Sequence, residues 1–515
     1  MPHQDAYRSL RFPKGKTEET KPGLYKWKAL FTVAMGMLMA TMDSSITNIA
    51  FPTLTRVFHA ELATIIWISV AYILTSTSTL LVLGKISDVI GRTRMYVAGM
   101  ALFTLGMLAC SLSRGIGDLI FYRCVQGLGA AMTISCGTAI VAEAFPVEET
   151  GKGLGMLGVA VSLGFIIGPV LGGFLLDWLD WRSIFYARVP IALISLGMAF
   201  VLLQKDKTGS VSFRIDWIGA LTSSAGIFCL VYGVGMVEEW GVFSPPAFAF
   251  AGSGILFLAA FVLAERTADD PLVDLTLFSN VTFRYAASGL FFTFVAAPPF
   301  ILTMPFYLIE GIHLSPSQTG LLLAVSSMVT MVSGPISGSL SDRFGAAPFA
   351  AAGASAMTAS FILMLFFDLH TPMGAIVFVL VLLGAGIGMF QAPNNSQIMG
   401  SAPRNRLGTA SALIATLRQV GLSLGMAIAG SLYTFRIETH QEKLIKNGMG
   451  DSEAGRNAVP AAFHDGLILS IALSSLVIVF TILCMRSRRK KRDGYTGKAG
   501  QNNGRNGEIM EKSRT

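Results

Sequence analysis

The segment GKISDVIGRTR, residues 84–94, lies between two apolar stretches, and a shortened copy, GSLSDRFG, residues 338–345, lies between two others. In each copy, glycines permit a tight turn between neighbouring helices, and an aspartate can lie near the positive N-terminal end of the next helix. Two similar loops in one apolar chain indicate an internal duplication. The loop residues that carry this repeated motif are Gly84, Asp88, Gly91, Arg92 and Asp342.

Composition places the chain in a membrane. Of its 515 residues, 52% are hydrophobic and only 14% are charged, and the mean hydropathy of +0.60 is too high for a soluble globular protein. Apolar stretches of roughly 18 to 25 residues, each long enough to cross a bilayer as a helix, recur about fourteen times. The first lacks a small-residue cleavage site, so we expect a retained helix and not a signal peptide.

The net charge of +8 reflects membrane topology and does not indicate nucleic-acid binding. If the N-terminus is cytoplasmic, most of the 39 Lys and Arg residues fall in segments on that side. We therefore expect both termini in the cytoplasm and a multi-pass protein of the plasma (inner) membrane. The basic run at residues 486–492 is typical of a stop-transfer anchor, and the polar tail after it is expected to be disordered.

The spacing of the two loops predicts the domain organisation. Their aspartates are about 250 residues apart, whereas a six-helix half takes roughly 190 to 200 residues. About two spans are in excess, so parallel halves with a substrate path between them would be separated by an insertion. The expected parts are a tail at 1–26, a six-helix half at 27–203, a hinge and inserted helix pair at 204–264, a second six-helix half at 265–485, and a tail at 486–515.

The first loop resembles the signature that the major facilitator superfamily carries between its second and third helices, G-x-x-x-D-x-x-G-R-x-R or close to it. The second loop lacks the final arginine pair, since alanines follow Gly345. Fourteen spans narrow the resemblance to the drug:H+ antiporter family 2, the EmrB/QacA-like group. The string DSSITNIAFP at residues 43–52 is similar to that family's first-helix motif. The resemblance implies an all-α major facilitator fold of two six-helix halves plus two inserted helices.

Asp43 is the candidate proton-coupling group, about 16 residues into the first expected helix. A carboxylate at that depth is unfavourable unless it faces water or a partner, and ionisable groups inside a membrane mark ion paths. The alternative is a structural acid bonded to Asn48 and Thr47 or to a neighbouring helix. The resemblance to the family motif favours a coupling role.

The fourth helix carries a small polar stripe formed by Arg123, Gln126, Gly127 and Ala130. The string RCVQGLG at residues 123–129 resembles the superfamily motif R-x-x-Q-G-x-G, which implicates the arginine in proton transfer. A guanidinium does not release its own proton, so Arg123 would hold a carboxylate and orient water. A fixed hydrogen-bond donor between helices is the structural alternative.

Gly164, Gly168 and Gly172 line one face of the fifth helix, and Pro169 removes one of its backbone hydrogen bonds. Such a stripe alone indicates close helix packing. The string GFIIGPVLGG at residues 164–173 resembles the antiporter signature G-x-x-x-G-P-x-x-G-G, which implies an exporter.

Two residues depart from the family pattern. Arg188 occupies a position where the family has Asn, and is either a surface charge that snorkels to the membrane edge or a contact for an anion or substrate. Glu310 stands where Gln is common, and is either a solvated carboxylate or a second site for a proton or cation. The candidates for the substrate path are Asn48, Gln126, Arg188, Phe291, Tyr307, Asn394 and Arg418.

The remaining motifs exclude other classes. The sequence has no G-x-x-x-x-G-K-[ST] and no His/Cys spacing for a metal, so we expect neither cofactor nor metal. It shows no grouping of nucleophile, base and oxyanion donors, so we do not expect an enzyme. We expect a proton-coupled exporter of small amphipathic compounds, with the substrate, protons and the bilayer as partners, no nucleic acid and no obligate protein partner. The alternative is a dedicated exporter of one endogenous metabolite, siderophore or lipid-like molecule; a passive uniporter or a non-transporting receptor is less well supported.

Overall fold

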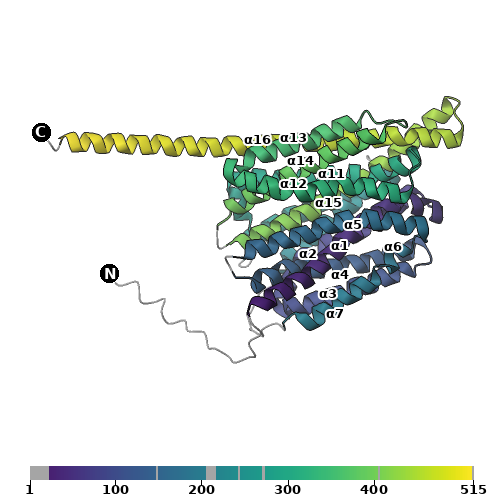
Figure 1. Cartoon of the computed structure of the whole chain (residues 1–515), viewed down its shortest axis with the longest axis horizontal. Coiled ribbons are helices and arrows are strands. Elements are labelled where there is room, and N and C mark those ends of the chain that lie inside the picture. Colours follow the sequence, from purple (N-terminus) through teal and green to yellow (C-terminus); the bar gives the residue numbers. More distant parts are fainter. Residues whose placement is uncertain are drawn as a thin grey trace.

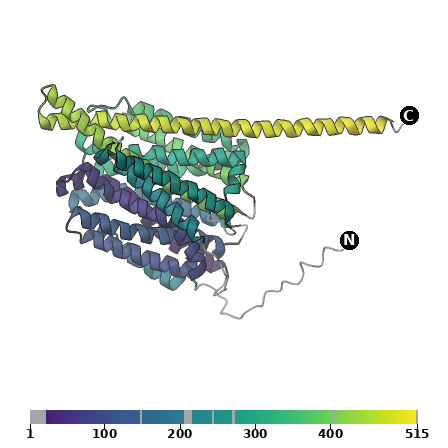
Figure 2. The same cartoon turned by 180° about the vertical axis from the view of Figure 1, so that it is seen from behind.

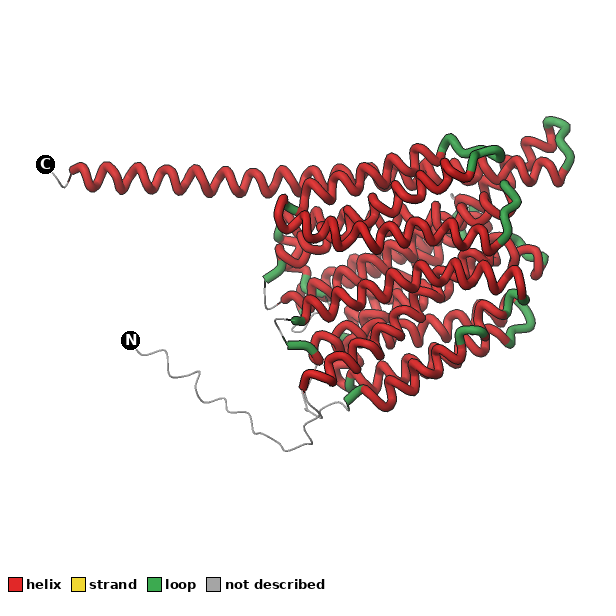
Figure 3. The backbone as a smooth tube through the Cα atoms, in the orientation of Figure 1, coloured by secondary structure: helices red, strands yellow, loops and turns green. Residues whose placement is uncertain are grey.

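The computed structural model describes residues 22–146, 149–204, 216–241, 244–268, 273–403 and 406–512, and within them it contains helices and no strands (Figure 3). Fourteen helices in these ranges are long and apolar enough to cross a membrane. The all-α fold with fourteen spans is confirmed.

The helices run nearly side by side in one bundle (Figures 1 and 2). The N-terminal half contains α1 (Pro22–Phe58), α2 (Leu62–Ile90), α3 (Arg92–Ser111), α4 (Ile116–Ala144), α5 (Thr150–Trp178), α6 (Ser183–Tyr186) and α7 (Val189–Leu202). The insertion contains α8 (Trp217–Gly235), α9 (Val237–Trp240) and α10 (Pro245–Thr267). The C-terminal half contains η1 (Leu275–Ser279), α11 (Val281–Phe306), η2 (Tyr307–Gly311), α12 (Pro316–Phe344), α13 (Ala346–Met364), α14 (Met373–Ser401), α15 (Leu407–Lys446) and α16 (Asp451–Lys512).

Each of the two repeated loops folds as a single-glycine junction. Gly91 separates α2 from α3 with φ 110°, and Gly345 separates α12 from α13 with φ 96°. Only glycine adopts these positive φ values readily, so its place in the motif sets the helix ends. Asp88 pairs with Arg92 at 2.7 Å (Oδ1 to Nη2), and Arg92 also pairs with Glu143 of α4. The loop is thus tied to the end of α4.

The inserted helices cover one side of the boundary between the halves. Helix α8 contacts both α2 and α15, and α10 packs on α8. The Ser224 hydroxyl of α8 donates to the Ser78 carbonyl of α2 at 2.5 Å, and the Ser431 hydroxyl of α15 donates to the Val234 carbonyl of α8 at 2.9 Å. Helix α8 therefore spans the boundary between the two halves.

Helices α5 and α12 contact each other across the boundary between the halves. A Cβ on Gly173 would overlap the carbonyl of Pro316, and the backbone of Ser317 donates to Asp177 Oδ2 at 3.0 Å. Toward the other end, a Cβ on Gly158 or on Gly334 would have nothing within 4 Å. Helix α1 begins at this second end of the bundle, and the last part of α16 projects past it (Figure 1).

Two expected boundaries change. Helix α1 begins at Pro22, inside the expected tail at 1–26, because proline is well suited to the first position of a helix. Helix α16 continues to Lys512, so the tail at 486–515, expected to be disordered, is helical through that residue. No proline follows Pro460 to end the helix. The expected hinge at residues 204–210 lies outside the described residues from residue 205 on.

Candidate functional site

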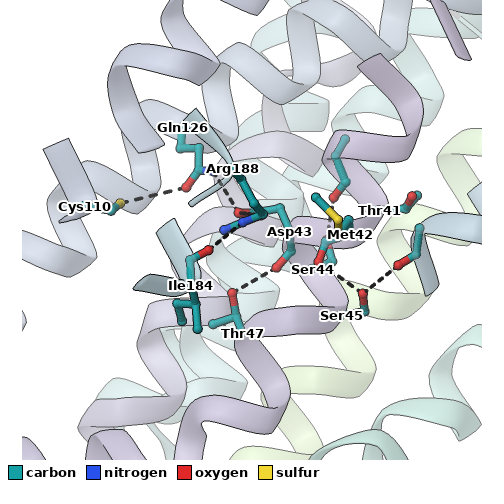
Figure 4. A network of polar contacts seen from close by, with 12 residues as sticks. Thr41, Met42, Asp43, Ser44, Ser45, Thr47, Cys110, Gln126, Ile184 and Arg188 are labelled. Atoms are coloured by element: carbon teal, nitrogen blue, oxygen red, sulfur yellow. Dashed lines mark hydrogen bonds and ion pairs between the residues drawn. The ribbon is translucent and has the colours of Figure 1, made fainter. Parts of the chain in front are cut away.

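Asp43 lies on α1 with no exposed surface, surrounded by three side chains from other helices (Figure 4). Arg123 Nη1 of α4 donates to Asp43 Oδ2. Gln126 Nε2 of α4 donates to Oδ1 at 2.9 Å, and Arg188 Nη1, at the start of α7, pairs with Oδ1 at 2.7 Å. The carboxylate therefore ties α1 to α4 and α7.

Arg123 is held from several sides. Its Nε donates to the Ile68 carbonyl of α2 at 3.0 Å, and its Nη1 also donates to Gln126 Oε1 at 2.9 Å. The Tyr72 ring of α2 lies 4.3 Å from its Cζ, a cation–π contact. Arg123 thus contacts α2 and Gln126 in addition to Asp43.

Arg188 has fewer contacts. Its Nε donates to the Ile184 carbonyl one turn earlier at 2.5 Å, and its Nη2 has no hydrogen-bond partner among the described residues. Its side chain, like that of Arg123, has no exposed surface. Its Cζ also lies 5.9 Å from the Phe185 ring, so its contacts other than Asp43 are to residues of the adjacent α6.

The cluster of Asp43, Arg123 and Arg188 holds two positive charges and one negative charge. Burying a charge without a full complement of partners is unfavourable, and ionisable groups in such places mark functional sites in membrane proteins. The arrangement can bind or release a proton at the carboxylate, and doing so changes the attraction between three helices.

The structure narrows two of the sequence-based alternatives: the Asp43 carboxylate is bonded to a neighbouring helix, as the structural alternative allows, but not to the two residues of its own helix. Asp43 is not bonded through its carboxylate to Thr47 or Asn48, because Thr47 donates to the Asp43 backbone carbonyl at 2.9 Å and Asn48 Oδ1 has no partner in the described part of the chain. Arg188 is not a surface charge that snorkels outward, because it is buried against Asp43. Helix packing explains both corrections, since the faces of α4 and α7 that meet α1 are not apparent from the chain order.

The three glycines of α5 pack on α1 next to the cluster. The Ser45 hydroxyl donates to the Gly164 carbonyl at 3.1 Å, and a Cβ on Gly168 would overlap that hydroxyl. A Cβ on Gly172 would lie 2.5 Å from Ile46 Cγ1. The carbonyl of Pro169 lies against Gly320 of α12, so α5 contacts both α1 and the other half.

The other predicted residues lie apart from Asp43 in their contacts. Glu310 lies in the π-helical turn η2, half-buried. The Tyr307 ring stacks on Phe463 at 4.9 Å, and its hydroxyl donates to the Asp368 carbonyl at 2.7 Å, so it packs within the C-terminal half. Asn394 of α14 donates to the Ala286 carbonyl at 3.0 Å.

Arg418 of α15 and Phe291 of α11 are half-buried. Phe291 packs edge-on against Phe292 at 5.4 Å between ring centroids.

An apolar cavity of about 470 Å3, wide open to the surface, lies on α12, α13 and α14, and the sequence reasoning missed it. Its signal was present: Met328, Val332, Ile336 and Leu340 repeat every fourth residue on one face of α12. None of the predicted substrate-path residues lines it. The lining residues are Met328, Val329, Val332, Ser333, Ile336, Ser337, Leu340, Phe349 and Met389.

A family model described as the Major Facilitator Superfamily matches residues 33–426, from α1 into α15. The chain belongs to the Major Facilitator Superfamily. Within the superfamily it is 31% identical over 468 residues to riboflavin transporter RibZ of Clostridioides difficile, covering 90% of this chain and 99% of that protein. It is 30% identical to multidrug resistance protein Stp of Mycobacterium tuberculosis, covering 81% of this chain and 78% of that protein.

Solved structures of other transporters share the fold. A bacterial homologue of the human lysosomal transporter Spinster, in an inward-facing and unoccupied conformation, superposes with a TM-score of 0.60 at 12% identity, covering 91% of this chain and 99% of that one. The human organic anion transporter MFSD10 superposes with a TM-score of 0.59 at 15% identity, covering 89% and 99%.

Proposed function

We propose that this protein is a proton-coupled exporter of the drug:H+ antiporter family 2, which moves small amphipathic compounds out of the cytoplasm by alternating access. The observation that supports the proposal most is the buried Asp43 carboxylate between two arginines. A proton on Asp43 weakens the attraction of α1 for α4 and α7, so protonation and the arrangement of these helices are linked.

The packing of α5 transmits such a change between the halves. One face of α5 contacts α1 through Gly164 and Gly168. The C-terminal end of α5 contacts α12 through Gly173 and Asp177. If α1 shifts on protonation, the close fit at the glycines makes α5 shift with it. The contact with α12 then opens or closes.

With cytoplasmic termini, the contact of α5 with α12 through Gly173 and Asp177 supports a state that is open to the cytoplasm. Helices α5 and α12 meet at Gly173 and Pro316, at the end of the bundle opposite to the start of α1. The apolar cavity lies on the part of α12 that carries Gly334. An apolar cavity suits the hydrophobic part of an amphipathic compound. In this state the substrate enters from the side of the termini.

A dedicated transporter of one compound is the second candidate. It is favoured by the riboflavin transporter, which aligns with 90% of this chain, whereas the multidrug relative Stp aligns with 81%. A growth panel decides between the two candidates: an efflux-deficient host is challenged with dyes, biocides and antibiotics, with and without this gene. Resistance to several unrelated compounds supports multidrug export. Protection against none of them, with movement of riboflavin in vesicles, supports the second candidate.

Asp43→Asn tests the coupling in inverted membrane vesicles. The amide keeps the shape of the side chain but cannot cycle a proton, so pH changes induced by a transported compound, such as ethidium or riboflavin, should disappear. Asp118→Asn, an exposed carboxylate in the first turn of α4, is the matched control and should leave the pH change intact. An unchanged proton flux in Asp43→Asn would remove Asp43 from the mechanism and make Glu310 the next candidate.

A further inference from the structure

The buried cluster contains an arginine that the proposed mechanism does not require. Asp43 and Arg123 alone are a neutral pair, and Arg188 adds a second ion pair to the same carboxylate and one surplus positive charge. All three side chains lack exposed surface, so the surplus is not screened by solvent.

We infer that Arg188 is a positioning residue for the coupling carboxylate: it fastens the corner between α6 and α7 to Asp43 and is released when Asp43 takes up a proton. The inference rests on the proposed function, because it assumes that Asp43 exchanges protons. It adds the residue through which proton uptake would act on a third helix.

Counting charges gives the direction of the effect. With Asp43 ionised the cluster carries one positive charge, and with Asp43 protonated it carries two guanidinium charges that repel each other. Arg123 keeps the Ile68 carbonyl of α2, Gln126 and the Tyr72 ring at 4.3 Å. Arg188 keeps the Ile184 carbonyl and a longer contact of 5.9 Å to the Phe185 ring, both in the adjacent short helix α6. Arg188 is therefore the member of the pair that moves.

The groups that face Asp43 come from several helices, and Figure 4 labels Gln126, Arg188 and Cys110 among them. They are Arg123 and Gln126 of α4, Arg188 before α7, Tyr72 of α2, and Cys110 of α3, whose thiol contacts Gln126 at 3.8 Å. Helix α5 presents backbone at Gly164. Arg188 is the one of these groups that lies in a short connection, between α6 and α7, and not within a long helix.

The test measures how the distance between the two halves changes with pH, and it needs no substrate. Spin labels are attached to cysteines at Trp178 of α5 and Leu321 of α12, both exposed near the end where the halves meet, after Cys124 and Cys229 are replaced by serine. The purified full chain is titrated with acid, and the distance distribution gives the pH midpoint of the conformational change. Elution as a single species on gel filtration checks the fold of each variant.

Arg188→Asn should move this midpoint to higher pH by at least about one unit, because protonation no longer has to overcome a second guanidinium. Arg188→Lys keeps the charge and should stay nearer to the wild-type midpoint. Arg182→Asn is the matched control, since Arg182 lies just before α6, at the other end of that short helix, and contacts Ser113 and Asp180 and not Asp43. Arg188→Gln replaces the Asn variant if that variant fails to fold.

The outcomes separate the two proposals. If Asp43→Asn abolishes the pH response but Arg188→Asn keeps the wild-type midpoint, the inference about Arg188 is wrong and the coupling role of Asp43 stands. If Asp43→Asn still responds to pH as the wild type does, or the wild type itself does not respond, the proposed coupling at Asp43 fails. A midpoint that moves with Arg188→Asn and equally with Arg182→Asn would also overturn the inference, since it would reflect a general change in surface charge.

Discussion

Two acidic residues stand in different surroundings near the membrane-spanning helices. Asp43 has no exposed surface and receives three side chains from other helices. Glu310 is half-buried in a π-helical turn at the end of a span, where water is closer. A buried carboxylate needs such partners because no water solvates it. The side chains around Asp43 therefore stabilise a charge, whereas Glu310 is partly exposed to solvent.

Glu310→Gln should therefore leave substrate-induced proton flux within about twofold of wild type, because the coupling carboxylate remains in place. The measurement is the pH change in inverted vesicles, with Asp43→Asn as the variant that loses it. Loss of flux in Glu310→Gln, with normal membrane insertion, would show that a second carboxylate takes part in coupling.

The glycines of α5 have different packing environments along the helix. Its middle lies directly on α1, where a Cβ on Gly168 would overlap the Ser45 hydroxyl and approach the Met42 carbonyl to 2.9 Å. A Cβ on Gly158, nearer the N-terminus of α5, would have nothing within 4 Å. The same residue type thus serves close packing at one position and faces open space at the other.

Gly168→Val should reduce the transport rate at least about fivefold with little change in expression, because the branched side chain separates α5 from α1. Gly158→Val carries the same substitution on the same helix and should retain wild-type transport. The rates are compared by dye efflux from cells with matched protein levels. Equal activity of the two variants would mean that the close fit of α5 on α1 does not limit transport.

The whole molecule is closed at one end by a contact between its halves. The Asp177 carboxylate of α5 accepts from the backbone of Ser317 in the first turn of α12. A negative charge at the positive end of a helix is favourable there, and the contact must break for the halves to separate at this end. Asp177 was not among the residues that the sequence reasoning selected.

Asp177→Ala should raise the population separated at this end by about fivefold, which corresponds to the loss of about 1 kcal/mol from a capping contact. The distance between spin labels at Trp178 and Leu321 measures this population. Asp180→Ala, which removes a carboxylate that pairs with Arg182 of the same half, is the control and should leave the distribution unchanged. If both variants match the wild type, the Asp177 contact contributes nothing to closure.

The sequence by itself determined the properties that depend on local pattern. Apolar runs predicted the fourteen spans, and the glycines of the repeated loop predicted the junctions at Gly91 and Gly345. The motif containing Asp43 and the motif containing Arg123 each pointed to a polar residue inside a helix. Hydropathy and short motifs report where a residue lies along its own helix, and these predictions needed nothing more.

Only the tertiary structure decided which of these residues meet. Arg188 contacts Asp43, and Asp177 contacts the first turn of α12, because separate helices pack with particular faces together. The local sequence pattern does not predict which faces meet. The apolar cavity on α12 likewise exists because α13 and α14 leave that face of the helix uncovered. Helix faces are chosen by close packing over the whole bundle, so contacts between distant residues are set by the fold and not by the segments that contribute them.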